Sequence, residues 1–492
     1  MENRRKFLMM GGALVGGVVA APFLSQIGRS SATPAPNMSG MDMFQIMNPG
    51  AVVPAAEKLT ISPFSLPLPI PPVLAPTWSS ATEDHYDQKI QIANQELVPG
   101  LITQVRAYGG QFVGPTIRAR SGRTVSVTYT NQLDSETNVH LHGGHVQADS
   151  DGYPTTTIQP NQTITYRYSN LQQGATLWYH AHPHMAEYIE VYAGQHGFYL
   201  IDDDAETHLG LPSGQYDVPV MLANAQFDTT TGALINGDPR DRNVLLVNGR
   251  PQPYFEVAAR KYRLRFLNGS NEGILTLSLD GANLVQIASD GGLLPAPVPR
   301  ANFTISSGER QEVVIDFSHC KIGSQVMLND PVYGEVMRFD VVRHEPDPSR
   351  LPAVLRPLPP LPPPTRTRDV TMSFDLDPVP LGLINGVPFD PTRDDFVTRR
   401  GTTEIWNVTN GDAQYGFDHN FHIHLVQYRV LERNGKPPTL DDQGRKDVVY
   451  LPSGDTVKLQ ATFADYTGRY VYHCHFLEHS SIGMMANLRI DP

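Results

Sequence analysis

The chain has 492 residues, of which 40% are hydrophobic, and a formal net charge of −12. This length exceeds what a single hydrophobic core usually supports, so we expect two to four domains. The acidic balance argues against nucleic acid as a partner. Proline (42) and glycine (41) are plentiful, which favours short strands joined by turns.

Residues 1–35 are interpreted as an export signal and the start of a linker. The pair Arg4-Arg5, followed by Phe-Leu, precedes a short apolar run over residues 9–24 that is rich in Gly and Ala. A basic start, a modest apolar segment and small residues after it are typical of such signals. The paired arginines resemble the twin-arginine type, so we expect a periplasmic or extracellular protein. A membrane anchor is disfavoured because the run is short and contains Pro22.

Residues 31–60 are small, polar and proline-containing, as expected of a linker. Four methionines cluster here: Met38, Met41, Met43 and Met47. Thioethers suit Cu(I), so a copper-binding arm is conceivable, but a flexible or locally packed tail is the favoured interpretation.

Residues 50–205 are predicted to form a first β-domain. Segments of alternating polar and apolar residues are separated by Gly, Pro, Asn and Asp; they are Leu59–Ser62, Lys89–Ile92, Thr103–Tyr108 and Thr124–Tyr129. This pattern is typical of an antiparallel β-sandwich or barrel. The same region contains two His-x-His pairs, His140/His142 and His180/His182.

Residues 206–345 are predicted to form a second β-domain. Its clearest strands are Val218–Leu222, Val244–Val247, Tyr262–Leu267, Thr276–Leu279 and Glu312–Asp316. It has no dense histidine motif, so we expect it to act as a structural spacer. The proline-rich tract over residues 346–368 is predicted to be a semi-extended linker.

Residues 369–492 are predicted to form a third β-domain, with strands at Val370–Phe374, Thr403–Val408 and Thr456–Leu459. It contains a third His-x-His pair, His422/His424, and the stretch HCHFLEHSSIGMM from His473 to Met485. The aromatic and β-branched residues 468–472 predict a strand that runs into this stretch. Neighbours on a strand face opposite ways, so His473 and His475 should face one side and Cys474 the other.

The histidine pairs predict a multinuclear metal cluster. The two imidazoles of each pair share a face of a strand, so one pair can address one cluster. Four such pairs provide eight imidazoles, enough for about three copper ions, and imidazole with thiolate and thioether suits copper best. Two pairs lie in the first domain and two in the last. We therefore expect the cluster at an interface between these domains.

A second metal site is predicted around Cys474. His419 lies an odd number of positions from His422, so on a regular strand it faces the other way, as Cys474 does. Together with His479 and Met484 these residues form the two-His, one-Cys, axial-Met set of a blue copper electron-transfer site. Met485 is the competing axial candidate.

These four motifs, in this order, resemble those of the three-domain multicopper oxidases of the laccase-like, bacterial type, and the resemblance covers nearly the whole mature chain. It implies an all-β fold of three cupredoxin-like Greek-key β-sandwich or barrel domains. It also implies four coppers per chain. By resemblance the type 2 copper is held by His140 and His422; the type 3 pair by His142, His180, His182, His424, His473 and His475; and the type 1 copper by His419, Cys474, His479 and Met484.

The resemblance also implies an activity. A reducing substrate gives single electrons to the type 1 copper, and these cross Cys474, His473 and His475 to the trinuclear cluster, where O2 is reduced to water. Members that oxidise Cu(I) often carry a Met-rich insertion in the third domain, and this chain has none there. We therefore expect phenols, aromatic amines or bilirubin-like compounds as substrates. We also expect the protein to be a monomer.

Three other functions are compatible with parts of this pattern. A metallo-oxidase acting on Cu(I) in copper tolerance is the main alternative. A non-catalytic envelope scaffold of the same fold is disfavoured by the intact ligand set. A copper nitrite reductase is disfavoured because such chains resemble two domains with a simpler site.

Proton delivery needs a carboxylate near the cluster. Asp151, in the loop after His142, resembles the acidic residue that the family uses there, and Asp149 is the alternative. Several bacterial relatives place Glu directly after the histidine that corresponds to His479, where this chain has Ser480. The relay is therefore expected to depend on Asp151 and water. Asp418, Asp441 and Asp442 lie near the type 1 motif in sequence and could orient a substrate, although a solvated loop is the default interpretation.

Overall fold

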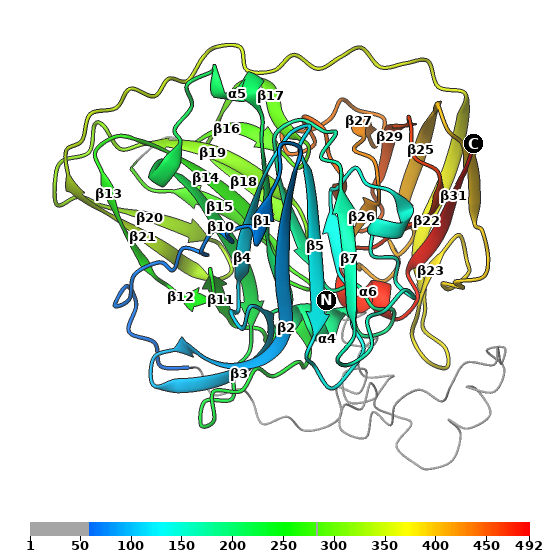
Figure 1. Ribbon diagram of the computed structural model, residues 1–492, viewed down its shortest axis with the longest axis horizontal. Helices are drawn as coiled ribbons and strands as arrows, with labels where there is room; N and C mark the ends of the chain where they lie inside the picture. The colour runs from blue at the N-terminus through cyan, green and yellow to red at the C-terminus, as the bar shows by residue number, and fades with distance from the viewer. Residues whose placement is uncertain (1–58, 282–283) are drawn as a thin grey trace.

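The computed structural model describes residues 59–281 and 284–492, and these residues form three β-sandwich domains in succession (Figure 1). The first domain packs a five-stranded sheet against a four-stranded one. The strands of the larger sheet are β1 (Trp78–Ser79), β2 (Glu83–Val98), β3 (Leu101–Tyr108), β5 (Thr124–Asn131) and β7 (Thr163–Tyr168). Those of the smaller sheet are β4 (Gly114–Arg120), β6 (His140–His142), β8 (Ala175–His180) and β9 (His196–Asp202).

The second domain packs a seven-stranded sheet against a five-stranded one. The larger sheet contains β10 (Asp217–Ala225), β11 (Val244–Val247), β12 (Arg250–Pro251), β14 (Lys261–Asn268), β16 (Leu284–Ser289), β17 (Gly292–Arg300) and β19 (Arg310–Asp316). The smaller contains β13 (Tyr254–Ala258), β15 (Ile274–Leu279), β18 (Asn302–Ser306), β20 (Gln325–Asp330) and β21 (Gly334–Arg343).

The third domain is built from two five-stranded sheets. One contains β22 (Arg366–Asp375), β23 (Leu381–Ile384), β25 (Thr402–Asn410), β27 (Arg429–Arg433) and β29 (Thr456–Phe463). The other contains β24 (Phe396–Arg399), β26 (His419–Ile423), β28 (Val448–Leu451), β30 (Gly468–His473) and β31 (Met485–Asp491). Helices in the described residues are short: α4 (Glu187–Tyr192), α5 (Asp204–Thr207) and α6 (Leu477–Ser481), with 3-10 turns η1 (Ala148–Ser150), η2 (Gly214–Tyr216) and η3 (Pro239–Asp241).

Each sandwich encloses its own apolar core, as alternating strands require when one face of each sheet is buried. The cores centre on the fully buried Tyr129, Phe266 and Trp406 in the first, second and third domains. The all-β prediction is confirmed. All but one of the predicted strands lie within observed strands. The exception is Leu59–Ser62, which forms no strand; instead Leu59 and Ile61 pack on an apolar cluster shared by the first two domains.

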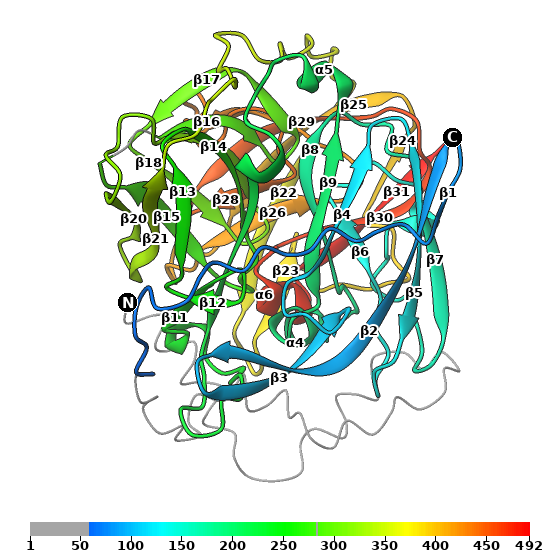
Figure 2. The same ribbon diagram turned by 60° about the vertical axis from the view of Figure 1, so that its left-hand side comes forward.

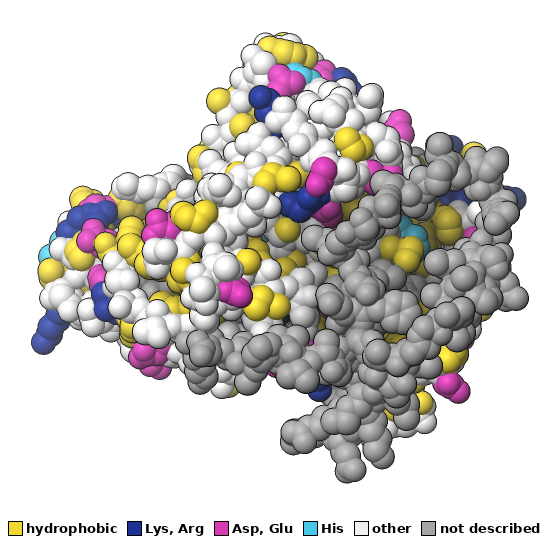
Figure 3. Space-filling view, turned by 90° about the horizontal axis from the view of Figure 1, so that it is seen from below, with side chains coloured by type: hydrophobic (Ala, Val, Ile, Leu, Met, Phe, Trp, Pro, Cys, Tyr) yellow, Lys and Arg dark blue, Asp and Glu magenta, His cyan; other side chains and the backbone are white. Residues whose placement is uncertain are grey.

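The predicted export signal and the methionine cluster lie outside the described residues. No described helix is long and apolar enough to cross a bilayer. Charged side chains of both signs, several of them side by side, are spread over the described part of the face in Figure 3.

The proline-rich linker is bound along its length to the domains that it passes. It runs over the top of the molecule in Figure 1 and reaches the third domain at β22, which begins at Arg366, inside the predicted linker tract. Leu355 is buried against the second domain, and Arg356 pairs with Asp203 of the first at 2.7 Å. The linker therefore helps to fix the relative positions of the domains.

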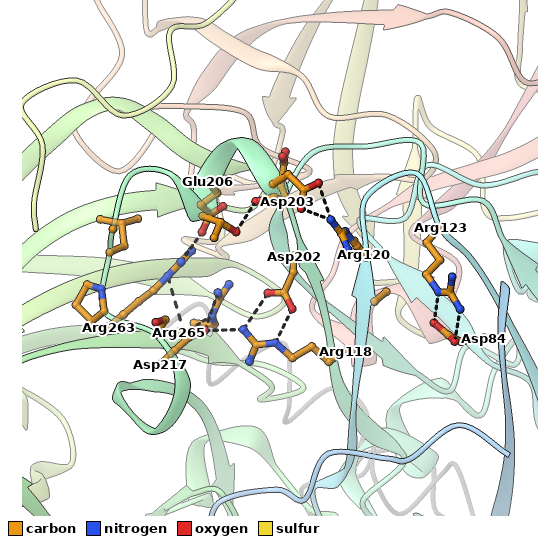
Figure 4. Close-up of a pocket in the computed structure, with 17 residues that line it drawn as sticks. Asp84, Arg118, Arg120, Arg123, Asp202, Asp203, Glu206, Asp217, Arg263 and Arg265 are labelled. Atoms are coloured by element: carbon orange, nitrogen blue, oxygen red, sulfur yellow. Dashed lines mark hydrogen bonds and ion pairs between the residues drawn. The ribbon is translucent and has the colours of Figure 1, made fainter. Parts of the chain in front are cut away.

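Ion pairs line a cleft of about 640 Å³ between the first and second domains (Figure 4). Asp217 accepts hydrogen bonds from Arg265 (2.6 Å) and from Arg118 (2.9 Å). Burial raises the pKa of Asp217, but the neighbouring arginines outweigh burial and lower it below its usual range. Glu312, also in this network, accepts from Arg265 at 3.0 Å. Of these contacts, the one from Arg118 joins the first domain to the second, and those from Arg265 lie within the second domain.

Candidate metal centre

The four histidine pairs meet between the first and third domains, as predicted. In the first domain β6 pairs with β8, placing His140 opposite His180. In the third, β26 pairs with β30, placing His422 opposite His473. Figure 2 shows β6 and β30 close together although they are far apart in sequence. The resulting eight-histidine cluster is fully buried and consists of His140, His142, His180, His182, His422, His424, His473 and His475.

The eight imidazoles can be divided into the three groups that the resemblance implies, but ring distances alone do not separate them, because His140 stacks on His424 (3.7 Å) and His142 on His422 (3.9 Å) across the groups. Nε2 of His473 lies 3.2 Å from Nε2 of His182 and 3.3 Å from Nε2 of His424. A second group contains His142, His180 and His475, whose ring centroids are 4.7–5.6 Å apart. The remaining pair is His140 and His422, with centroids 5.9 Å apart. Two groups of three and one of two can hold three ions.

The orientation of the rings is set by hydrogen bonds on their outward nitrogens. Nδ1 donates to a main-chain carbonyl in four of the eight: His140 to Asp151, His180 to Ala181, His422 to Asp447 and His473 to Cys474. Nε2 of these rings is left to face the centre. A metal-binding histidine usually has such a partner on its second nitrogen, which fixes its tautomer.

His142 is turned the other way round. Its Nε2 donates to Oδ1 of Asp447 at 3.0 Å, which leaves Nδ1 facing inward without a hydrogen-bond partner. Asp447 is itself held by two hydrogen bonds of 2.6 Å from Arg310 of the second domain. Lys446 and Asp290 extend this buried network. The second domain, predicted to be a spacer, therefore also supports the cluster.

Asp151 is buried against the cluster, whereas the alternative Asp149 is exposed. Oδ2 of Asp151 accepts a hydrogen bond from Nδ1 of His424 at 2.7 Å, and Oδ1 lies 3.6 Å from Nδ1 of His140. Burial raises the pKa of Asp151 to about 6. A bound cation would favour its ionised form.

Burial also keeps the imidazoles neutral. It lowers the pKa of His140, His424 and His473 to about 3 in each case, and in His140 and His473 the neighbouring His424 adds to the effect. Neutral imidazole is the form that binds metal. The cluster is therefore ready for metal at neutral pH.

The second predicted site is also assembled, from His419, Cys474 and His479, here named the Cys474 cluster. The Nδ1 atoms of the two histidines are 3.1 Å apart, and Sγ of Cys474 lies 3.9 Å from His419 and 3.6 Å from His479. Nε2 of His419 donates to Asp412 at 2.8 Å. Burial raises the pKa of the Cys474 thiol to about 12. Only a bound cation would stabilise a thiolate there.

The strand register separates the two candidate axial methionines. Met485 lies opposite His473 in the β30–β31 pair, so its side chain is on the face of the eight-histidine cluster. Met484 belongs to the same buried core as Cys474. Its main chain accepts from Cys474 N at 3.1 Å and donates to the His479 carbonyl at 3.0 Å. The geometry favours Met484.

One edge of the Cys474 cluster reaches solvent. The His479 side chain is 12% exposed, and its Nε2 lies 3.6 Å from a carboxylate oxygen of Glu272, from the second domain. Phe374 packs on His479 with ring centroids 4.8 Å apart. Two of the three aspartates suggested by sequence have other partners here: Asp441 pairs with Arg300 and Asp442 with Arg433.

Several supporting residues were not predicted from sequence: Asp412, Asp447, Glu187, Glu272 and Arg310. Asp447, Glu272 and Arg310 come from elements distant in sequence from the cluster residues that they support, whereas Asp412 and Glu187 lie within seven positions of His419 and His182. No sequence motif identifies these residues. The one available indication was a charged residue directly beside apolar, strand-forming residues. Conversely, His145 and His184, which flank the motifs, lie outside both clusters; His145 pairs with Asp465.

The donor sets fit copper. Nε2 of His140, His180 and His422 is buried and has no hydrogen-bond partner. Buried polar atoms are normally satisfied, so these nitrogens need a bound group such as a metal ion. Two imidazoles with a thiolate and a nearby thioether are typical of blue copper sites.

Comparison with known proteins agrees with this assignment. Three multicopper oxidase family models match residues 89–206, 215–339 and 358–492. The chain is 34% identical to a laccase of Bacillus stratosphericus, over 86% of this chain and 98% of that one. It is also 34% identical to a bilirubin oxidase of Albifimbria verrucaria, over 86% and 80% of the two chains. The crystal structure of a laccase from Pediococcus acidilactici superposes with a TM-score of 0.82 at 30% identity, covering 88% and 95%.

The fold and the two clusters define a copper oxidase built from cupredoxin-like domains. The chain belongs to the multicopper oxidase family and is an oxidoreductase of the laccase-like type, which uses O2 and a reducing substrate.

Proposed function

We propose that this protein oxidises phenols, aromatic amines or bilirubin-like compounds one electron at a time and couples this to the four-electron reduction of O2 to water. Four coppers would be held: type 1 by the Cys474 cluster with Met484, type 2 by His140 and His422, and the type 3 pair by the other six histidines. Bound copper supplies the redox chemistry at both sites. In this proposal the Cys474 cluster receives the electrons, Cys474 and its two neighbours connect the clusters, and the eight-histidine cluster reduces O2.

The partly exposed edge of His479 carries the substrate part of the proposal. Glu272 lies 3.6 Å from this edge, so its carboxylate can accept the hydrogen bond of a phenol whose ring contacts the imidazole. An apolar wall is available beside it, because Phe374 packs on the same histidine. An amphipathic aromatic reductant fits this combination.

The connection between the two clusters is covalent and short. Cys474 has its side chain in one cluster, and its neighbours His473 and His475 have theirs in the other. On the oxygen side, Asp151 is the group proposed to hold a proton, at Oδ1, which has no hydrogen-bond partner. We also propose that the protein is exported through its twin-arginine-type signal and acts as a monomer.

A parallel turnover assay of the copper-loaded protein tests the proposal. Oxygen uptake is measured with a phenol, bilirubin, Cu(I), Fe(II) and Mn(II). We expect the phenol or bilirubin to give the highest kcat/KM. A preference for Cu(I) would instead identify a metallo-oxidase, and no uptake with any donor would identify a non-catalytic scaffold.

The substitution Glu272→Gln tests the substrate contact. A neutral amide accepts a weaker hydrogen bond than a carboxylate, so KM for the phenol should rise several-fold while the blue absorption stays unchanged. Asp441→Asn is the control, because that carboxylate pairs with Arg300. Equal KM values for the wild type and Glu272→Gln would exclude this role for Glu272.

A further inference from the structure

Helix α4 of the first domain carries two buried glutamates, and one of them contacts the eight-histidine cluster. Glu187 is 1% exposed and Glu190 is 4% exposed. Glu190 faces Arg106, with which it forms an ion pair of 3.1 Å. Among the described residues Glu187 forms no ion pair with Lys or Arg, and it points towards helix α6 of the third domain, where Leu477 packs on Tyr188. The two glutamates are therefore matched in burial but differ in environment.

The two carboxylate oxygens of Glu187 face different clusters. Oε1 lies 3.5 Å from Nδ1 of His182, and both atoms are buried without another hydrogen-bond partner. Oε2 accepts a hydrogen bond of 2.8 Å from the hydroxyl of Ser480. Ser480 directly follows His479, a member of the Cys474 cluster. One side chain thus lies between a histidine of one cluster and the helix that carries a histidine of the other.

His182 needs an acceptor at this position. A histidine that binds metal through Nε2 keeps its proton on Nδ1 and usually donates it to a carboxylate or carbonyl. His424 has Asp151 for this purpose, and His142, which is turned the other way round, donates to Asp447 from Nε2 instead. Oε1 of Glu187, 3.5 Å from Nδ1 of His182, is the acceptor that the structure places at this position.

We propose that Glu187 is a positioning residue for both metal clusters: it orients His182 directly, and through Ser480 it holds helix α6 and therefore His479 in place. The inference rests on the copper-binding part of the proposed function. It also gives a physical account of Ser480. A glutamate at position 480 would bring a second carboxylate against Glu187 in a buried site, which is strongly unfavourable.

The first test compares Glu187→Ala and Glu187→Gln with Glu190→Gln, all loaded with copper. The measurements are copper per chain, the paramagnetic resonance spectrum and the visible absorption. For Glu187→Ala we expect copper affinity to fall about 10–100-fold, with altered signals from both clusters. Glu187→Gln keeps a hydrogen-bond acceptor and should recover part of the loss. Glu190→Gln should leave the copper content and spectra unchanged.

The second test exchanges the carboxylate between the two positions. Ser480→Glu alone should lower copper content, because two carboxylates would share one buried site. Adding Glu187→Ser to Ser480→Glu should restore it, because one carboxylate and one hydroxyl are again in contact. Far-UV circular dichroism of each metal-free variant checks that the chain has folded.

The outcomes separate this inference from the proposed function. If the wild type binds copper and turns over while Glu187→Ala has the same copper content and spectra, the positioning role is wrong and the function stands. If the double variant binds no more copper than Ser480→Glu alone, the contact between positions 187 and 480 does not position the copper ligands. If the wild type binds no copper, both proposals fail.

Discussion

Asp151 contacts two histidines of the cluster, through Oδ2 to His424 and through its carbonyl to His140. Replacing it by Asn keeps the shape but removes the charge and the group that can exchange a proton. We expect Asp151→Asn to slow oxygen reduction about 10–100-fold. The blue absorption of the Cys474 cluster should be retained.

Oxygen uptake and visible absorption, measured on the same preparation, check this prediction. Asp149→Asn is the matched control, because Asp149 lies two residues away and is exposed. Unchanged turnover in Asp151→Asn would show that protons reach the cluster by another group.

The buried histidines should make the metal-free protein sensitive to acid. Three of them, His140, His424 and His473, have a pKa of about 3 when folded, against an ordinary value of 6.5. Between pH 6.5 and pH 3 the unfolded chain takes up protons that the folded chain does not, so stability falls as pH falls. Across this window each of the three histidines lowers the free energy of unfolding by on the order of 1 kcal/mol for each pH unit of acidification.

Asp151 and Glu187 act in the opposite direction, since burial raises their pKa values to about 6 and about 8. The pKa of all eight imidazoles is lowered, so the histidines outnumber these two carboxyls. The thermal midpoint of the metal-free protein should therefore fall as the pH is lowered from 7 to 4. A midpoint that stays level or rises towards pH 4 would contradict the assignment of neutral, buried histidines.

At the scale of the element, the loop between β18 and β19 brings the second domain against the cluster. Gly308 in this loop has φ +85°, and a Cβ there would lie 2.9 Å from Nδ1 of His475. Gly308→Ala should therefore displace His475 in addition to straining the backbone, and copper content should fall.

Gly323→Ala is a close control for Gly308→Ala. Gly323 has φ +87°, with nothing within 4 Å of the added Cβ, so it experiences the backbone strain alone, about 1–2 kcal/mol. Copper per chain and the thermal midpoint are measured for both. Equal copper content in the two variants would show that the loop does not position His475.

The histidine-bearing strands were predictable because strand parity is a local property. His473 and Cys474 are neighbours, so the sequence alone placed their side chains on opposite faces. The partners of the outward nitrogens were not predictable in this way. Asp447 reaches His142, and Glu187 reaches Ser480, only after separate domains have docked, and no local pattern encodes that docking.

At the scale of the whole molecule, the buried ion pairs at the junction of the first two domains should be important for stability. Arg265 is 2% exposed and hydrogen-bonds both Asp217 and Glu312. Arg265→Met would leave these carboxylates with fewer partners, and breaking a buried pair costs about 3–5 kcal/mol. Thermal unfolding measures the effect.

Arg120→Met is the control on the same cleft. Arg120 pairs with Asp204 in an exposed position, where solvent screens the interaction, so little change in the thermal midpoint is expected. If both variants unfolded at the temperature of the wild type, the junction would not depend on its buried ion pairs.

The three-domain plan followed from length, turn frequency and the separation of the histidine motifs, whereas the part played by the second domain did not. Its strands were correctly located, but a search for histidines could not detect a contribution made by Arg310 and Gly308. These residues act on side chains of other domains. Their importance depends on tertiary contacts rather than on any pattern within the second domain.

The location of the eight-histidine cluster has a consequence for the order of events during biosynthesis. Half of its histidines come from the first domain, on β6 and β8 or directly after β8, and half come from the third domain, which is synthesised later. Strand β30 needs β31, which ends at Asp491, as its partner in the sheet. The complete cluster therefore cannot form until the third domain has left the ribosome as far as β31, and its full set of metal ions can be inserted only after that point.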